Sequence, residues 1–167
     1  MVKNKETTTY FVVILCSAWI LLLSGTTYDR NFTWQDDSTL WKDVITKSPA
    51  KWRGYGFLGI AYADLAYYDA AKEMFNTSLA LNEPNPRMYN NRANLLLTTG
   101  HLEAAIADYA KAIELDPEFD RAYRNRGVAF LKMGRRTEAI ADLQHACDLG
   151  NSSSCILLEE LLVTNTD

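Results

Sequence analysis

Two cysteines near the carboxyl end of the sequence could react with each other. Cys147 and Cys155 are separated by the seven residues DLGNSSS. A helix end, a turn and a helix start within that length can bring two Cα atoms to within about 6 Å, a separation that a disulfide can bridge. Two ordinary, half-buried thiols are the alternative. A location outside the cytoplasm would favour the bridge, because disulfides persist in oxidising compartments.

Residue sets that carry out catalysis or bind metals are missing from the sequence. It contains no nucleophile paired with a base and no phosphate-binding loop. His101, His145 and three cysteines, with no Cys-x-x-Cys, offer almost no ligands for a zinc site. Aspartates and glutamates are plentiful, and we expect them, including Asp108 and Asp142, to lie on solvated faces of the protein. The sequence therefore predicts a protein that is not an enzyme and that needs no metal or cofactor.

The composition limits the partners and the number of domains. A chain of 167 residues, 48% of them hydrophobic, can form one domain and a small additional segment. Its net charge of −4 argues against nucleic acid as a partner, because domains that bind nucleic acid are usually basic.

Residues of the same size return at intervals of 34 positions. The series are large (Trp41, Phe75, Tyr109, Leu143), aromatic (Tyr55, Tyr89, Tyr123), alanine (Ala71, Ala105, Ala139) and small (Gly59, Ala93, Gly127). Large and small residues that recur in phase indicate a stack of repeated units. Within each unit the hydrophobic residues recur at helical spacing, which predicts an all-α fold.

We expect each unit to be a hairpin of two helices. The predicted first helices cover residues 52–66, 86–99 and 120–133, and the predicted second helices cover residues 69–81, 103–115 and 137–149. The turns contain Ala66, Gly100 and Gly134, and the small residues of each unit should meet where its two helices cross. A half unit, capped by Asp36, Asp37 or Ser38, should precede the array. A final helix over residues 153–163 should cover the last hairpin with Cys155, Ile156, Leu158, Leu161 and Leu162.

This pattern resembles the tetratricopeptide repeat family, most closely in the segment RMYNNRANLLLTTGHLEAAIADYAKAIELDPEF. The resemblance covers about residues 36–150, although the first unit has Ser78 where alanine is usual. It implies an α–α solenoid of one half repeat, three full repeats and a capping helix. The stretch ACDLGNSSSC resembles the Sel1-like relatives of this family, in which two cysteines at this separation join the helices of a hairpin.

The resemblance also implies a binding surface, formed by the first helix of each repeat. In this sequence the groove residues would be Arg53, Arg87, Asn90, Asn91, Asn94, Arg121, Arg124, Asn125 and Lys132. Arginine binds carboxylates and asparagine pairs with a peptide backbone, so the expected partner is an extended acidic or carboxy-terminal segment of a protein. The alternative is that these arginines are solvated and pair with neighbouring acids. The resemblance does not extend to the clamp for chaperone tails, because Gly56 replaces its first lysine.

Residues 7–28 carry no charge and predict a transmembrane anchor. As a helix they would extend about 33 Å, enough to cross the hydrocarbon of a bilayer. A cleaved signal peptide and a buried core helix are the alternatives. Lys3 and Lys5 favour a cytoplasmic amino terminus, which would place the repeats in the periplasm or elsewhere outside the cytoplasm.

These observations divide the chain into an anchor, a connector with the half repeat, three repeats and a cap. The predicted boundaries are 1–28, 29–51, 52–85, 86–119, 120–150 and 151–167. The predicted function is that of a membrane-anchored scaffold or accessory subunit that binds other proteins. The connector RNFTWQDDSTLWKDVITKSP is similar to one in polytopic glycosyltransferase-like proteins, so a fragment or accessory subunit of such a protein is one alternative. A structural subunit of a larger membrane complex is the other.

Overall fold

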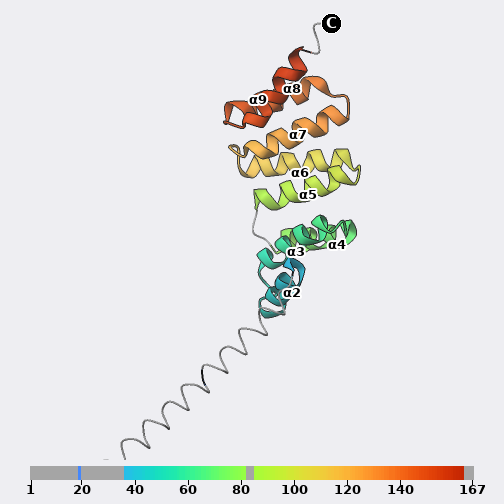
Figure 1. Cartoon of the computed structure of the whole chain (residues 1–167), viewed down its shortest axis with the longest axis vertical. Coiled ribbons are helices and arrows are strands. Elements are labelled where there is room, and N and C mark those ends of the chain that lie inside the picture. Colours follow the sequence, from blue (N-terminus) through green and yellow to red (C-terminus); the bar gives the residue numbers. More distant parts are fainter. Residues whose placement is uncertain (1–18, 20–35, 82–84, 164–167) are drawn as a thin grey trace, which may run out of the picture.

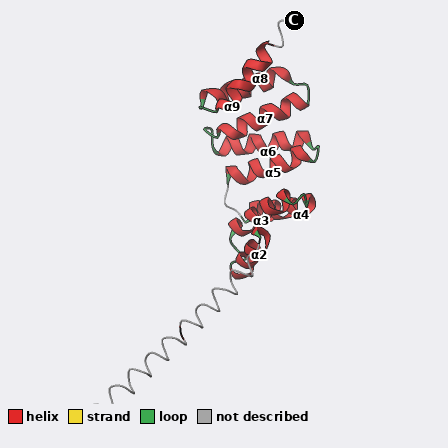
Figure 2. Ribbon diagram, in the orientation of Figure 1, coloured by secondary structure: helices red, strands yellow, loops and turns green. Residues whose placement is uncertain are grey.

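The computed structural model describes Trp19, residues 36–81 and residues 85–163. The regular elements in this part of the chain are all helices (Figure 2). Their bounds are α2 (Asp37–Lys47), α3 (Trp52–Asp64), α4 (Tyr68–Ala80), α5 (Pro86–Thr98), α6 (Leu102–Leu115), α7 (Asp120–Lys132), α8 (Arg136–Asp148) and α9 (Ser152–Val163). Except for Trp19, the anchor predicted over residues 7–28 lies outside the described residues. None of the helices described here is both long and apolar enough to span a bilayer.

The helices pair into hairpins that stack along one direction (Figure 1). The pairs are α3 with α4, α5 with α6, and α7 with α8; α2 packs on α3 at one end, and α9 packs on α8 at the other. The predicted all-α solenoid of stacked helical hairpins is confirmed. The ends of the six repeat helices differ from the expected ones by at most two residues.

Local sequence explains where the helices start and turn. The Asp36 carboxylate accepts a hydrogen bond from the Thr39 backbone N–H at 2.8 Å and so caps α2. Gly100 and Gly134 have φ angles of +82° and +73°, as expected for residues that follow a helix end. Ala66 occupies the same turn position in the first repeat, with φ of +59°.

Small residues allow the two helices of a hairpin to approach closely. A Cβ atom added to Gly59 would lie 2.9 Å from the Phe75 ring and 3.3 Å from the Ala71 carbonyl oxygen. In the third repeat, a Cβ atom on Gly127 would lie 3.3 Å from the Ala139 carbonyl oxygen. The expected crossings of small residues are therefore present, and the large residue of each repeat fills the adjacent space in the core.

Ser78, which replaces the usual alanine in the first repeat, is buried without loss of a hydrogen bond. Its hydroxyl donates to the Trp52 carbonyl oxygen at 3.0 Å. This bond joins the end of α4 to the start of α3. The serine therefore connects the two helices of its hairpin, because a buried hydroxyl is tolerated when it is paired.

The predicted packing of α9 is only partly correct. Ser154 and Leu158 are buried, but Ile156 and Leu162 are 60% and 52% exposed. Residues two positions apart point about 200° apart around a helix, so Ile156 and Leu158 cannot share one face. Because α9 packs on α8 at the end of the stack, only one of its apolar faces is covered.

Candidate functional site

A groove of about 550 Å³ lies beside the first helices of the repeats, α3, α5 and α7. It contains apolar and cationic side chains together but no carboxylate. Its lining residues are Trp52, Arg53, Phe57, Ile60, Asn85, Pro86, Arg87, Met88, Asn90, Asn91, Phe119 and Arg121. The groove thus contains five of the nine predicted site residues.

Three exposed arginines, one from each repeat, surround the groove. Arg53, Arg87 and Arg121 form no ion pair with any residue in the described part of the chain. The guanidinium carbon of Arg53 lies 5.5 Å from the centre of the Trp52 ring, and that of Arg121 lies 5.8 Å from the centre of the Phe119 ring. Cation–π contacts of this kind orient an arginine while its N–H donors stay free for a ligand.

A second hollow of about 310 Å³ continues the groove along α3 and α5. It shares Ile60 and Asn91 with the first hollow and also contains Asp64 and Asn94. Asn91 therefore lies where the two hollows meet. A surface that continues in this way suits an extended chain better than a compact ligand.

The other predicted asparagines form a network within the protein. The Asn125 amide nitrogen donates to the side-chain oxygens of Asn90 and Asn94, at 3.1 Å in each case. The Tyr109 hydroxyl also donates to the Asn94 oxygen, at 2.6 Å. These bonds connect α5, α6 and α7, so these two oxygens already accept hydrogen bonds from the fold.

Two predicted cations lie outside the groove. Arg124 is half-buried, and its Nη1 donates to the Asn125 side-chain oxygen at 3.3 Å. Lys132 is exposed on the last turn of α7. Neither residue lines the hollow between Trp52 and Arg121.

The expectation that Asp108 and Asp142 face solvent is wrong. Both are buried, and each receives two hydrogen bonds from an arginine of the preceding helix. Arg92 binds Asp108 at 2.7 and 2.8 Å, and Arg126 binds Asp142 at 2.7 and 2.9 Å. The hydrogen bonds to the aspartates raise the pKa of both guanidinium groups. These two arginines therefore stabilise their hairpins and are unavailable to a ligand.

The aromatic lining of the groove was missed in the sequence. Trp52, Phe57 and Phe119 were not among the predicted site residues, because aromatic residues in a repeat more often belong to the core. One signal in the sequence could have located the groove: Arg53, Arg87 and Arg121 recur at the 34-residue interval, and the aromatic residues lie beside them. Cations that recur in phase with the core of a solenoid must project from equivalent faces of successive repeats.

Replacing Tyr109 by phenylalanine is expected to cost about 1 kcal/mol of stability at neutral pH, the net value of one hydrogen bond. Phe75 fills the same position of the first repeat, so the ring should fit. Burial, with a smaller contribution from the Asp108 charge, raises the pKa of Tyr109 above its usual value near 10. Its stabilisation is therefore complete below about pH 10 and decreases above it, as the unfolded state ionises more readily. Urea unfolding of both proteins at neutral and alkaline pH tests this: a difference that grows above pH 10 would contradict it.

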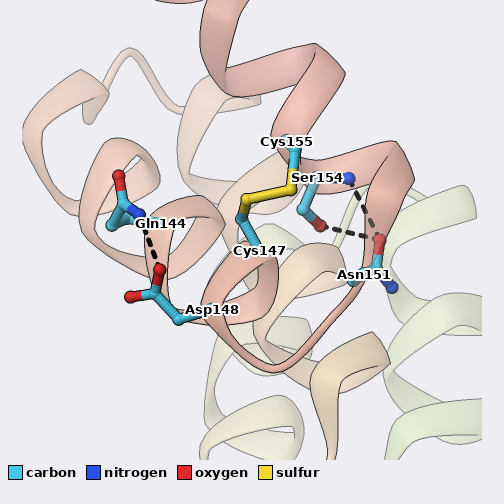
Figure 3. Close-up of a disulfide and its surroundings, with 6 residues drawn as sticks. All are labelled: Gln144, Cys147, Asp148, Asn151, Ser154 and Cys155. Carbon is cyan, nitrogen blue, oxygen red and sulfur yellow. Dashed lines mark hydrogen bonds between the residues drawn. A yellow bond between two sulfur atoms is a disulfide. The ribbon is translucent and has the colours of Figure 1, made fainter.

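Cys147 and Cys155 form a disulfide, with Cα atoms 4.9 Å apart. It joins the end of α8 to the start of α9 (Figure 3). Beside it, the Asn151 side-chain oxygen accepts hydrogen bonds from the Ser154 N–H and hydroxyl, both at 3.0 Å. Among the described residues, no three His, Cys, Asp or Glu side chains are grouped as a metal site requires.

Comparisons with known proteins agree with this architecture. Residues 93–134 match a family model described as TPR repeat, and residues 53–85 and 120–149 match one described as tetratricopeptide repeat. These matches together include more than half of the chain. A search of curated proteins found no match.

Several solved structures have the same fold. A structure of pilF from Pseudomonas aeruginosa has a TM-score of 0.72 and 22% identity, over 89% of this chain and 68% of that chain. A structure of MamA has a TM-score of 0.61 and 27% identity, over 65% of this chain and 60% of that chain, so the match spans less than two thirds of MamA. The first TPR of Spaghetti (RPAP3), bound to the HSP90 peptide SRMEEVD, has a TM-score of 0.65 and 22% identity, over 70% of this chain and 94% of that chain. On the family matches and on its stacked hairpins, the chain belongs to the tetratricopeptide repeat family.

Proposed function

We propose that this chain is a scaffold that binds an extended acidic segment of another protein in the groove beside α3, α5 and α7. The observation that carries the proposal is the set of three exposed arginines, Arg53, Arg87 and Arg121, around an apolar floor without a carboxylate. Such a surface matches a chain with an apolar side chain next to acidic ones. The asparagine at the meeting point of the two hollows, Asn91, is placed to pair with the backbone of that chain.

A solved relative supports a peptide as the ligand. The first TPR of Spaghetti was solved with the peptide SRMEEVD, which is acidic near its end. The way of binding is expected to differ here. A Cβ atom on Gly56 would lie 2.5 Å from the Met88 sulfur and 3.1 Å from the Ser78 hydroxyl oxygen, so the Met88 side chain occupies the space that a larger residue would need at this position. Recognition therefore rests on the recurring arginines and the apolar floor.

The proposal includes a membrane tether formed by residues 7–28, with the repeats in the periplasm or elsewhere outside the cytoplasm. The absence of charge over these residues supports the tether. The disulfide between Cys147 and Cys155 supports the location, because such bonds persist in oxidising compartments. A tether keeps the groove near membrane-bound partners and so raises their effective concentration.

Reversing two of the groove charges, Arg87→Glu with Arg121→Glu, is expected to lower the affinity for an acidic peptide by about 100-fold. Two hydrogen bonds to charged groups contribute at least about 3 kcal/mol together. The peptides would come from a display selection on the unmodified chain, and their affinities would be measured by fluorescence anisotropy. Crosslinking in native membranes would then identify the natural partner.

The matched control reverses two exposed lysines outside the groove, Lys42→Glu with Lys72→Glu, which changes the net charge by the same amount. It should leave the affinity within about 3-fold, since distant exposed charges are screened. A selection that enriches no acidic sequences, or equal losses in both double variants, would contradict the proposed groove.

A further inference from the structure

The turn between α3 and α4 exposes a cluster of large side chains, Leu65, Tyr67 and Tyr68. They are 55%, 61% and 38% exposed. The third of these turns has Met133, Gly134 and Arg135 at the places of Leu65, Ala66 and Tyr67, and the second has Thr99, Gly100 and His101. Two adjacent exposed tyrosines beside a leucine are thus a property of the first repeat alone among the three hairpins.

Packing of α2 against α3 places this turn at the point where the chain enters the solenoid. The Ile45 side chain lies 2.9 Å from where a Cβ atom on Gly54 would be, and the Trp41 and Phe57 rings stack at 4.5 Å. Lys42 Nζ lies 5.5 Å from the centre of the Tyr62 ring. The end of α2, at Ile45, therefore lies against the start of α3, at Gly54, and the earlier residue Trp41 lies against the later residue Phe57. The two helices are antiparallel, so the start of α2 lies at the same end as the turn.

The entry point is close, along the chain, to the uncharged segment. Seven residues, 29–35, separate that segment from Asp36, and even a fully extended connector of this length reaches only about 25 Å. We infer that Leu65, Tyr67 and Tyr68 contact the headgroup region of the bilayer and so orient the solenoid on the membrane. This inference rests on the tether proposed above. Tyr68 also lines the second hollow, whereas Leu65 and Tyr67 line neither hollow, so the test below is made at positions 65 and 67.

The residue types fit a shallow contact with a zwitterionic surface. Tyrosine prefers the boundary between hydrocarbon and water, because its ring is apolar and its hydroxyl is polar. Four exposed aspartates surround the turn and the start of α2: Asp36, Asp37, Asp64 and Asp69. They would be repelled by anionic lipid and would resist deep insertion. Phosphatidylcholine is therefore the lipid to test.

The experiment compares spin labels at three equivalent turn positions, Tyr67→Cys, His101→Cys and Arg135→Cys. Each is introduced into the full chain with Cys16→Ser and without reductant, so that the disulfide stays closed. The proteins are reconstituted into phosphatidylcholine vesicles. Collision rates of each label with oxygen, which concentrates in lipid, and with a nickel chelate, which stays in water, are measured by electron paramagnetic resonance. The ratio of the two rates should be several-fold higher at position 67 than at positions 101 and 135.

A second variant shows whether the cluster itself makes the contact. Adding Leu65→Thr, the residue found at this place in the second repeat, should lower the ratio at position 67 towards that at position 101. Equal ratios at the three positions, in protein that resists extraction from the vesicles by alkaline carbonate, would overturn the contact and leave the tether intact. Extraction of the protein by carbonate would overturn the tether and the contact together. The groove is tested separately by its peptides.

Discussion

Replacing Asp142 by alanine is expected to lower the free energy of unfolding by about 3 kcal/mol. The carboxylate accepts two hydrogen bonds from Arg126, and only 10% of its side chain is exposed. Without this carboxylate, the half-buried guanidinium of Arg126 would have no counter-ion. An unpaired buried charge lowers stability by more than the intact ion pair raises it. Urea unfolding monitored by circular dichroism would measure the change.

The first repeat suggests a variant that should restore this stability. At the positions equivalent to Arg126 and Asp142 it has Leu58 and Met74. Replacing a buried ion pair by apolar residues of similar size is often neutral or stabilising. Arg126→Leu with Asp142→Met is therefore expected to be more stable than Asp142→Ala alone.

A carboxylate on the surface of the same helix provides the control. Glu138 pairs with Arg135, and both side chains are 45% exposed. Glu138→Ala should cost much less stability than Asp142→Ala, because exposed ion pairs contribute little. If Asp142→Ala cost no more than Glu138→Ala, the buried pair would have no special role in the third hairpin.

Replacing Cys155 by serine is expected to lower the free energy of unfolding by about 2.5 kcal/mol, on the chain-entropy model for a loop of this size. The bridge joins α8 to α9, which has few other buried side chains. Helix α9 should therefore be the first element to exchange its amide hydrogens in the variant, because a terminal helix of a solenoid has only one neighbour.

Reductant provides an internal comparison for this prediction. It should destabilise the unmodified chain by the same amount and leave Cys155→Ser unchanged. Cys16→Ser should behave like the unmodified chain, since Cys16 takes no part in the bridge. Free thiols at both Cys147 and Cys155, found by mass spectrometry in protein taken from its own compartment, would contradict both the bridge and the proposed location outside the cytoplasm.

The helices of the solenoid could be predicted closely, because local signals specify them. The 34-residue interval fixed the phase of every repeat, and Gly100 and Gly134 marked the turns. Contacts between helices were predictable only at the helix crossings, where small residues recur. Gly59 and Gly127 could be placed at helix crossings because a small residue, glycine or alanine, recurs at this position in every repeat.

The candidate site was predictable in part. Arg53, Arg87, Arg121 and Asn91 lie in the groove, as expected from the face on which they occur. Asn94 and Asn125 occur on the first helices too, but their roles depend on which neighbours their amides reach. The position of a residue around its helix does not show which neighbours its side chain reaches. Those neighbours depend on how closely successive hairpins pack.

The sequence by itself determined the repeat, its phase and the face that each first helix presents, because these follow from the spacing of residue sizes along one chain. Only the tertiary structure decided which polar groups are buried. Arg92 meets Asp108 and Arg126 meets Asp142 across a hairpin, while Asn125 meets Asn90 between repeats. Such pairs form when helices are already packed, and the same residue types would be solvated on an isolated helix. Arg53, Arg87 and Arg121 form no ion pair within the part of the chain described, so their N–H donors are available to a ligand.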